Sequence, residues 1–244
     1  MDRDNLYALP RNRVGAFQFD DEVARVFPDM ISRSVPGYGS ILSMIEQLTG
    51  RFVRGGSHVY DLGCSLGAAT LLIRNHAPPD AVIHAIDNSP AMVRRLKASL
   101  AAGEESAHCP VDVRLADICD VPITEASMVV LNFTLQFVPA DRRSELLQRC
   151  YDGMQPGGGL LLSEKICFDD SGQQDLLGQL HLDFKRACGY SDLEIAQKRT
   201  SLENTLIPET LPVHCDRLRS AGFSVVAPWF QCFNFASILA VKAA

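Results

Sequence analysis

The sequence predicts an α/β domain built on a mostly parallel sheet, and three observations carry that prediction. Short apolar runs alternate with helical patterns along the chain. The last two extended runs, 224–230 and 235–241, have only four residues between them and must pair antiparallel. Each of four earlier apolar runs ends at or near an acidic or amide side chain. These runs are 58–62, 81–87, 111–115 and 127–131.

The first run leads into a turn of small residues and then a helix. Gly63, Ser65 and Gly67 let a ligand approach the backbone, while the helix presents free N–H groups to an anion. This pattern predicts a site for a nucleotide-like ligand. The same residues match the G-x-S-x-G nucleophile elbow of hydrolases, although nothing near Ser65 resembles an oxyanion loop. The dinucleotide pattern G-x-G-x-x-G is not matched, and a tight turn without a ligand is a third interpretation.

The next strand ends support the ligand-binding interpretation. Asp87 lies twenty residues after Gly67, where an acid meets ribose hydroxyls, and the following helix is expected to begin with Ser89 as N-cap. Asp117 follows the third strand and can accept from an exocyclic amine such as that of adenine. The fourth strand ends in Asn132, and a fifth is expected at 160–163. One such Asp is usually a helix cap, but several at successive strand ends favour a binding site.

An N-terminal helical cap is predicted for residues 17–50. One helix is expected to end at Pro28, and a second to begin after Ser40 as N-cap and end at Gly50. Tyr38 lies in the predicted turn between them, where its ring either covers the ligand or plugs the domain edge. The expected helices are 20–27 and 41–48.

A helical lid is predicted for residues 168–210, which interrupt the strand and helix alternation. The helical patterns run over 173–187 and 191–204. Basic pairs stand out on them in an acidic chain: Lys185 with Arg186, and Lys198 with Arg199. Such pairs usually form a solvated face, but a lid that closes over an anionic small molecule would also carry them.

Composition agrees with an ordinary enzyme of one domain spanning 1–244. The chain has 244 residues, of which 47% are hydrophobic, enough for one α/β core. Its net charge of −6 argues against nucleic acid as a direct partner. The eight cysteines have no C-x-x-C or zinc-like spacing, so we expect reduced thiols and no metal site. No run approaches a membrane span, so we expect a cytoplasmic protein with no membrane partner.

These features resemble the Rossmann-like class I S-adenosylmethionine-dependent methyltransferase fold, a mostly parallel seven-stranded sheet ending in an antiparallel hairpin. In that family the methionine part of the ligand lies at the first turn, the ribose at the second strand end and the adenine near the third. Asn132 is followed by Phe133-Thr134-Leu135, which differs from the Asn/Asp-Pro-Pro-aromatic signature common in amino-group methyltransferases.

Longer strings resemble the carboxy-S-adenosylmethionine synthase family. They include 26–31, 33–38, 60–70, 85–92, 129–137 and 229–235. The resemblance implies a homodimer that converts S-adenosylmethionine and prephenate to carboxy-S-adenosylmethionine and phenylpyruvate. The product would feed a separate tRNA carboxymethyltransferase that acts on wobble uridine. It also implies the ligand contacts Tyr38, Gly63, Cys64, Ser65, Asp87, Asn88, Asp117, Ile118, Asn132 and Arg199.

Specific roles follow from the resemblance as hypotheses. Arg199 is expected to bind the new carboxylate, and Lys185, Arg186 and Lys198 are weaker candidates for the carboxylates of prephenate. No side chain is an obvious strong base. Two other functions stay open at this point: a conventional methyltransferase of a small molecule or tRNA, and a binding module that delivers the cofactor derivative without catalysis.

Overall fold

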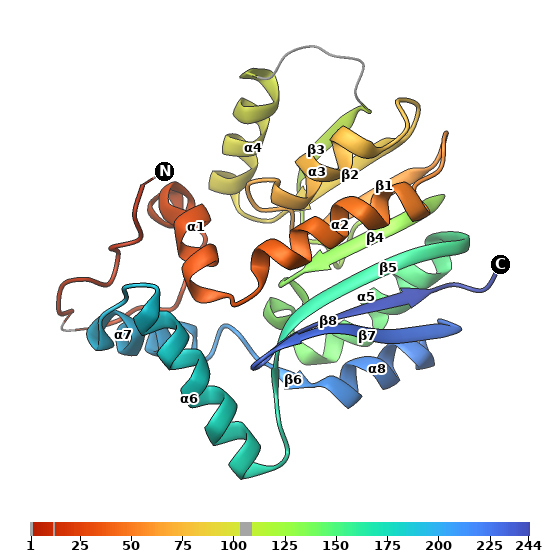
Figure 1. Ribbon diagram of the computed structural model, residues 1–244. Coiled ribbons are helices and arrows are strands. Elements are labelled where there is room, and N and C mark those ends of the chain that lie inside the picture. Colours follow the sequence, from red (N-terminus) through yellow and green to blue (C-terminus); the bar gives the residue numbers. More distant parts are fainter. Residues whose placement is uncertain (1, 12, 103–108) are drawn as a thin grey trace.

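The central sheet has the strand order β3-β2-β1-β4-β5-β8-β7 (Figure 1). The structure is a computed structural model that describes residues 2–11, 13–102 and 109–244. The first five strands of this order pair in parallel, and β8 is antiparallel to both β5 and β7. The strands are β1 (His58–Leu62), β2 (Val82–Asp87), β3 (Val111–Leu115), β4 (Ala126–Asn132), β5 (Met154–Cys167), β7 (Val225–Cys232) and β8 (Phe235–Val241). The predicted mostly parallel sheet with a closing hairpin is therefore confirmed.

Helices cover both faces of the sheet because apolar side chains point to both sides of its central strands. Val59 and Val130 pack with α2 and α3 on one face, whereas Val129 and Leu131 pack with α5 and α8 on the other. The helices are α1 (Asp21–Ser34), α2 (Tyr38–Phe52), α3 (Ala68–His76), α4 (Pro90–Ala102), α5 (Ala140–Gly153), α6 (Ser171–Ala187), α7 (Asp192–Leu202) and α8 (Leu211–Ser220), with a 3-10 turn η1 (Leu135–Phe137). In the described residues no helix is long and apolar enough to cross a membrane.

The prediction that Pro28 ends the first helix is wrong. Pro28 lies inside α1, which continues to Ser34. Proline removes one backbone donor and strains a helix, so packing has to offset that cost. Val26 and Met30, on either side of it, are buried in a cluster that includes Met92 of α4. Tertiary contacts therefore hold the helix together through the proline.

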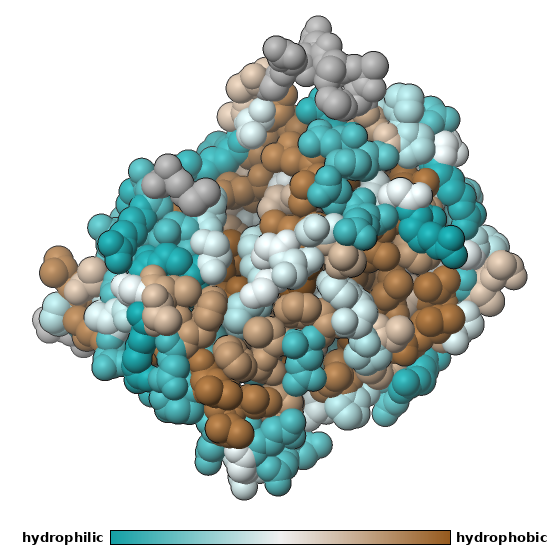
Figure 2. Space-filling view, in the orientation of Figure 1, coloured by the Kyte–Doolittle hydropathy of each residue, from teal (hydrophilic) through white to brown (hydrophobic). Residues whose placement is uncertain are grey.

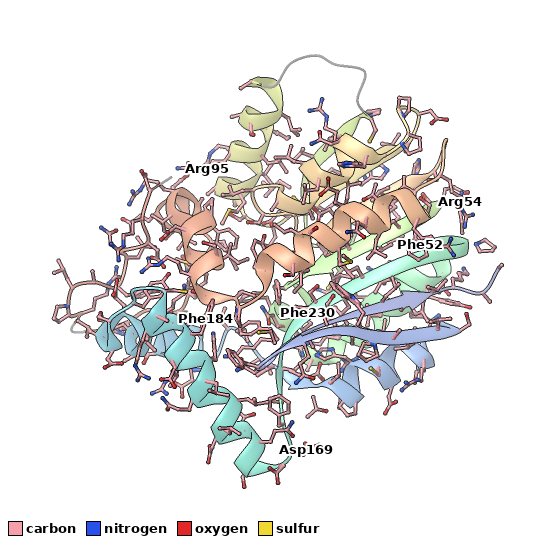
Figure 3. All side chains as sticks on the ribbon, in the orientation of Figure 1. Phe52, Arg54, Arg95, Asp169, Phe184 and Phe230 are labelled. Carbon is pink, nitrogen blue, oxygen red and sulfur yellow. The ribbon has the colours of Figure 1, made fainter. Side chains whose placement is uncertain are left out.

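The predicted limits of the second helix are also wrong. α2 begins at Tyr38, with Gly37 as N-cap in the left-handed conformation, and it runs through Gly50. The reason is a long-range contact, because the ring of Phe230 from β7 occupies the space that a Cβ at residue 37 would need, 2.3 Å away (Figure 3). Glycine alone fits there, so the helix starts three residues earlier than local capping signals indicate.

The insertion after β5 forms α6 and α7, which stand beside α1 and away from the sheet (Figure 1). The segment before α1 is bound to α7, since the side chain of Gln197 donates to the carbonyls of Tyr7 and Leu9. β5 is longer than expected at both ends. A two-residue strand, β6 (Glu209–Thr210), pairs with its far end and is not predicted by the sequence.

Candidate functional site

A cavity of about 340 Å³ lies at the carboxyl ends of β1, β2 and β4. This is the edge at which open parallel sheets bind ligands. Its walls come from these strand ends, from α1 and α2, and from the inner sides of α6 and α7. Most of the lining is apolar, with Phe19, Phe133 and Phe137 among its aromatic rings. The volume and lining suit a small organic ligand.

The turn after β1 is shaped for close ligand approach. Gly63 has φ +82°, and a Cβ there would lie 2.4 Å from the side chain of Thr134. Ser65 also has a positive φ, of 50°. The backbone N–H of Ser65 donates to Asp87 at 2.8 Å, which ties the first turn to the end of β2. The turn is thus fixed before any ligand arrives.

Asp87 is anchored by backbone donors and still faces the cavity. One carboxylate oxygen accepts from Ser65 N–H and the other from Ser89 N–H, each at 2.8 Å. Each oxygen keeps a further lone pair for a ligand hydroxyl. Burial raises the pKa of Asp87, while these hydrogen bonds oppose the rise. Ser89 caps α4 through Met92 N–H at 3.2 Å, as predicted.

The third and fourth strand ends complete this half of the cavity. Asp117 accepts from Cys119 N–H at 2.8 Å and lies 3.3 Å from Arg142, beside the buried side chain of Ile118. The Oδ1 atom of Asn132 is buried and has no hydrogen-bond partner within the described part of the chain. A buried unpaired acceptor is costly, so a ligand donor at Asn132 would remove that cost.

The cavity brings together nine of the ten residues that the family resemblance implies. They are Tyr38, Gly63, Cys64, Ser65, Asp87, Asn88, Asp117, Ile118 and Asn132. The tenth, Arg199, is exposed on α7 and does not line the cavity of this chain. Its positive charge nevertheless contributes to a lowered pKa of Lys165, whose burial is the larger cause. The charge of Arg199 therefore acts on Lys165, a residue of the lining.

Lys185 and Lys198 line the cavity, but the structure does not bring Arg186 there. The guanidinium of Arg186 pairs on the surface with Asp183 at 2.7 Å and Asp192 at 2.8 Å. The difference is one of helix geometry, because adjacent residues of a helix point in directions about 100° apart. Lys185 therefore faces inward while Arg186 faces out.

Sequence reasoning assigned no ligand role to three acidic or basic residues of the lining: Asp61, Lys165 and His181. Asp61 is 2% exposed, accepts from the Thr70 hydroxyl at 2.5 Å, and has its pKa raised to about 6 by burial. Its place at the end of the first strand was a usable signal. Lys165 and His181 come from β5 and α6, and no local pattern marks them.

The nucleophile interpretations gain no support from the geometry. The Ser65 hydroxyl donates to the thioether sulfur of Met92 at 3.4 Å and has no histidine partner in the described chain. Burial raises the pKa of the neighbouring Cys64 thiol, and the charges of Asp61 and Asp87 raise it further. A thiol held neutral is a poor nucleophile. The geometry therefore does not support an acyl-enzyme site at this turn.

Comparison with known proteins first defines the class. Residues 59–158 match the family model of the methyltransferase domain. The fold is similar to that of magnesium protoporphyrin IX methyltransferase from Synechocystis with bound S-adenosylhomocysteine. That comparison has a TM-score of 0.60 at 14% identity and covers 94% of this chain and 90% of the other. The chain thus has the fold of S-adenosylmethionine-dependent methyltransferases.

Two relatives then identify the family. The chain is 55% identical over 240 residues to carboxy-S-adenosyl-L-methionine synthase of Trichlorobacter lovleyi, covering 98% of each chain. It is 54% identical over 242 residues to the synthase of the same name from Escherichia coli K12, covering 99% of this chain and 97% of the relative. The chain belongs to the carboxy-S-adenosyl-L-methionine synthase family. It is a transferase that uses S-adenosylmethionine.

Proposed function

We propose that this protein converts S-adenosylmethionine and prephenate to carboxy-S-adenosylmethionine and phenylpyruvate. The observation that carries the proposal is the composition of the cavity. One half holds the strand-end residues suited to an adenosyl ligand, and the other holds the inward-facing lysines of β5, α6 and α7. Such a cavity suits a cationic sulfonium ligand together with an anionic co-substrate.

The proposed reaction balances without a strong protein base. Prephenate loses carbon dioxide and hydroxide as its ring becomes aromatic. The sulfonium methyl group gives a proton to that hydroxide, forming water, and the resulting carbanion attacks carbon dioxide to form the new carboxylate. The protein mainly positions the two substrates and keeps bulk water out. The apolar lining and the overlying helices support that role.

The family resemblance assigns Arg199 to the new carboxylate. We propose that residues 1–244 form a single domain with a cap at residues 17–50 and a lid at residues 168–210. We further propose that the lid brings Arg199 to the carboxylate. Its nearness to Lys165 supports the assignment. Replacing Arg199 by Ala should remove selective retention of the carboxylated ligand without unfolding the protein. Mass spectrometry of the co-purified ligand checks this, and unchanged retention would remove Arg199 from the role.

The function itself is tested by incubating the protein with S-adenosylmethionine, with and without prephenate, and weighing the products. We expect a mass gain of one carbon dioxide on the sulfonium compound, only when prephenate is present, and many turnovers per chain. A methylated product instead would favour a conventional methyltransferase. A single equivalent of product per chain would favour a delivery module.

We also propose a homodimer that works in the cytoplasm and passes its product to a separate tRNA carboxymethyltransferase. Figure 2 shows hydrophobic atoms beside hydrophilic ones in the region of α6, and on this helix Leu176 is 61% and Leu180 37% exposed. Apolar patches of this kind favour association. Light scattering of the wild type against Leu176→Asp tests the dimer: we expect the mass to halve in the variant. A monomeric wild type would contradict the proposal.

A further inference from the structure

Four basic side chains gather on the part of the cavity wall that β5, α6 and α7 form. Lys165 comes from β5, His181 and Lys185 from α6, and Lys198 from α7. Lys185 is only 8% exposed and Lys198 6%. Buried lysines are uncommon unless a negative partner stays close. This part of the wall therefore concentrates positive charge.

One of the three lysines already has a carboxylate nearby. Lys198 Nζ donates to Ser34 Oγ at 3.1 Å and lies 3.6 Å from Asp4, which is itself 2% exposed and accepts from the Tyr190 hydroxyl. Asp4 reaches this place because the N-terminal segment lies along α7. Lys198 is thus held in position by the protein itself.

The other two lysines have no such partner. Within the described residues, Lys165 and Lys185 make no ion pair, and neither Nζ atom donates a hydrogen bond to protein. Burial and the charges of Lys198 and Lys165 together lower the pKa of Lys185 to about 7, against the opposing charge of Asp4. Burial also lowers the pKa of Lys165, and the charge of Arg199 lowers it further. His181 Nε2–H donates to the Ser34 carbonyl at 2.8 Å, its only hydrogen bond to protein within the described residues, and burial lowers its pKa to about 3, which keeps it neutral.

We infer that Lys165 and Lys185 form a paired subsite for the two carboxylates of a small dianion, with Lys198 fixed beside them by Asp4. The inference rests on the proposed function and assigns the co-substrate of that function to these residues. A dianion would supply the negative charge that the lysines lack, and charge-assisted hydrogen bonds inside a water-poor cavity are stronger than on a surface. A monoanion would leave one lysine uncompensated, so the pair also selects for two carboxylates.

The inference is tested by measuring binding, which does not depend on turnover. Prephenate and the monoanion phenylpyruvate are titrated calorimetrically into the protein saturated with S-adenosylhomocysteine. The variants are Lys165→Met and Lys185→Met, and Lys97→Met on the exposed face of α4 is the matched control. We expect each cavity variant to lose about 10- to 100-fold in prephenate affinity, and the control to lose none. Phenylpyruvate should bind more weakly than prephenate to the wild type.

Two further readouts separate binding from a structural role. Affinity for S-adenosylhomocysteine should stay within about twofold of wild type. Prephenate binding at pH 8 should take up protons, because the dianion restores the charge of Lys185, and Lys185→Met should take up fewer. Four charged or titratable groups face Lys185: His181 on its own helix, Lys165 and Lys198 across the cavity, and Asp4. Beyond Asp4 lie Asp29 and Arg33 of α1.

The outcomes are distinguishable. Equal losses of S-adenosylhomocysteine and prephenate affinity would assign the lysines to the methionine carboxylate and overturn the inference. Unchanged prephenate affinity in both variants would also overturn it. Tight, lysine-dependent binding of prephenate without any carboxylated product would support the subsite while contradicting the proposed function.

Discussion

At the scale of single residues, Asp87 is a carboxylate that builds the site and that we propose also binds the ligand. It accepts two backbone N–H groups, one from the Ser65 turn and one from the start of α4. Replacing Asp87 by Ala should therefore weaken S-adenosylhomocysteine binding by about 10- to 100-fold, as expected for lost hydrogen bonds to a charged group. Calorimetry measures it, with Asp216→Ala, which removes an exposed ion pair on α8, as control. Equal affinity of the two variants for S-adenosylhomocysteine would contradict a role of Asp87 in binding the ligand.

Gly63 gives a second prediction at this scale. Its φ of +82° and the contact at 2.4 Å with Thr134 leave no room for a methyl group. Gly63→Ala should lower the free energy of unfolding by about 2 kcal/mol, because the left-handed conformation and the overlap both cost energy. Urea denaturation measures the change. Gly178→Ala in α6, where a Cβ meets nothing within 4 Å, should be neutral or stabilising instead.

At the scale of elements, Glu164 joins β5 to the η1 turn that borders the cavity. Its two oxygens accept from the backbone N–H groups of Leu135 and Gln136, each at 2.8 Å. Burial raises the pKa of Glu164 to about 8, and these hydrogen bonds together with the charge of Arg143 oppose the rise. The side chain of Gln136 in turn accepts from Lys165 N–H at 3.0 Å. The turn and the lysine strand are therefore coupled.

At pH 9, where Glu164 is ionised, Glu164→Gln should lower the free energy of unfolding by about 1–3 kcal/mol, because an amide N–H₂ would face a backbone donor and leave it unpaired. Chemical denaturation measures the loss. The same substitution at Glu145, an exposed residue of α5 paired with Arg149, should change stability little. A loss of similar size at both positions would show that the backbone contacts of Glu164 do not matter.

At the scale of the whole molecule, the basic part of the cavity wall makes stability depend on pH. Lys185 has a pKa of about 7 in the folded protein and 10.5 as its ordinary value. Between pH 7 and 10.5 the unfolded chain therefore binds more protons at this lysine than the folded protein does. Lys185 destabilises the folded state by its full amount below pH 7, and by progressively less as the pH rises towards 10.5. An anion bound at the proposed subsite would offset this cost.

Lys185→Met should accordingly raise the melting temperature of the ligand-free protein most at pH 7, by about 2–4 °C for each kcal/mol relieved, and least near pH 10. Calorimetric scans across this range measure the difference from wild type. Lys97→Met should give no such trend, since Lys97 is exposed. A difference that is constant with pH would exclude Lys185 as its source.

Local patterns predicted much of the sheet and half of the cavity. The strands from β1 to β4 and the Ser89 cap follow from apolar runs and capping chemistry that act over a few residues. The course of α1 through Pro28 and the start of α2 at Tyr38 could not be predicted this way. Both depend on side chains distant in the sequence, Met92 in one case and Phe230 in the other.

By itself the sequence determined the class of fold and the edge of the sheet where the cavity lies, because strand alternation and Asp87 at a strand end are short-range features. Only the tertiary structure decided that Lys165 and Lys185 share one part of the wall of that cavity while Arg186 faces solvent. The physical reason is that burial and charge separation depend on how β5, α6 and α7 pack together. The electrostatics of the site therefore arise from contacts between segments that no local pattern relates.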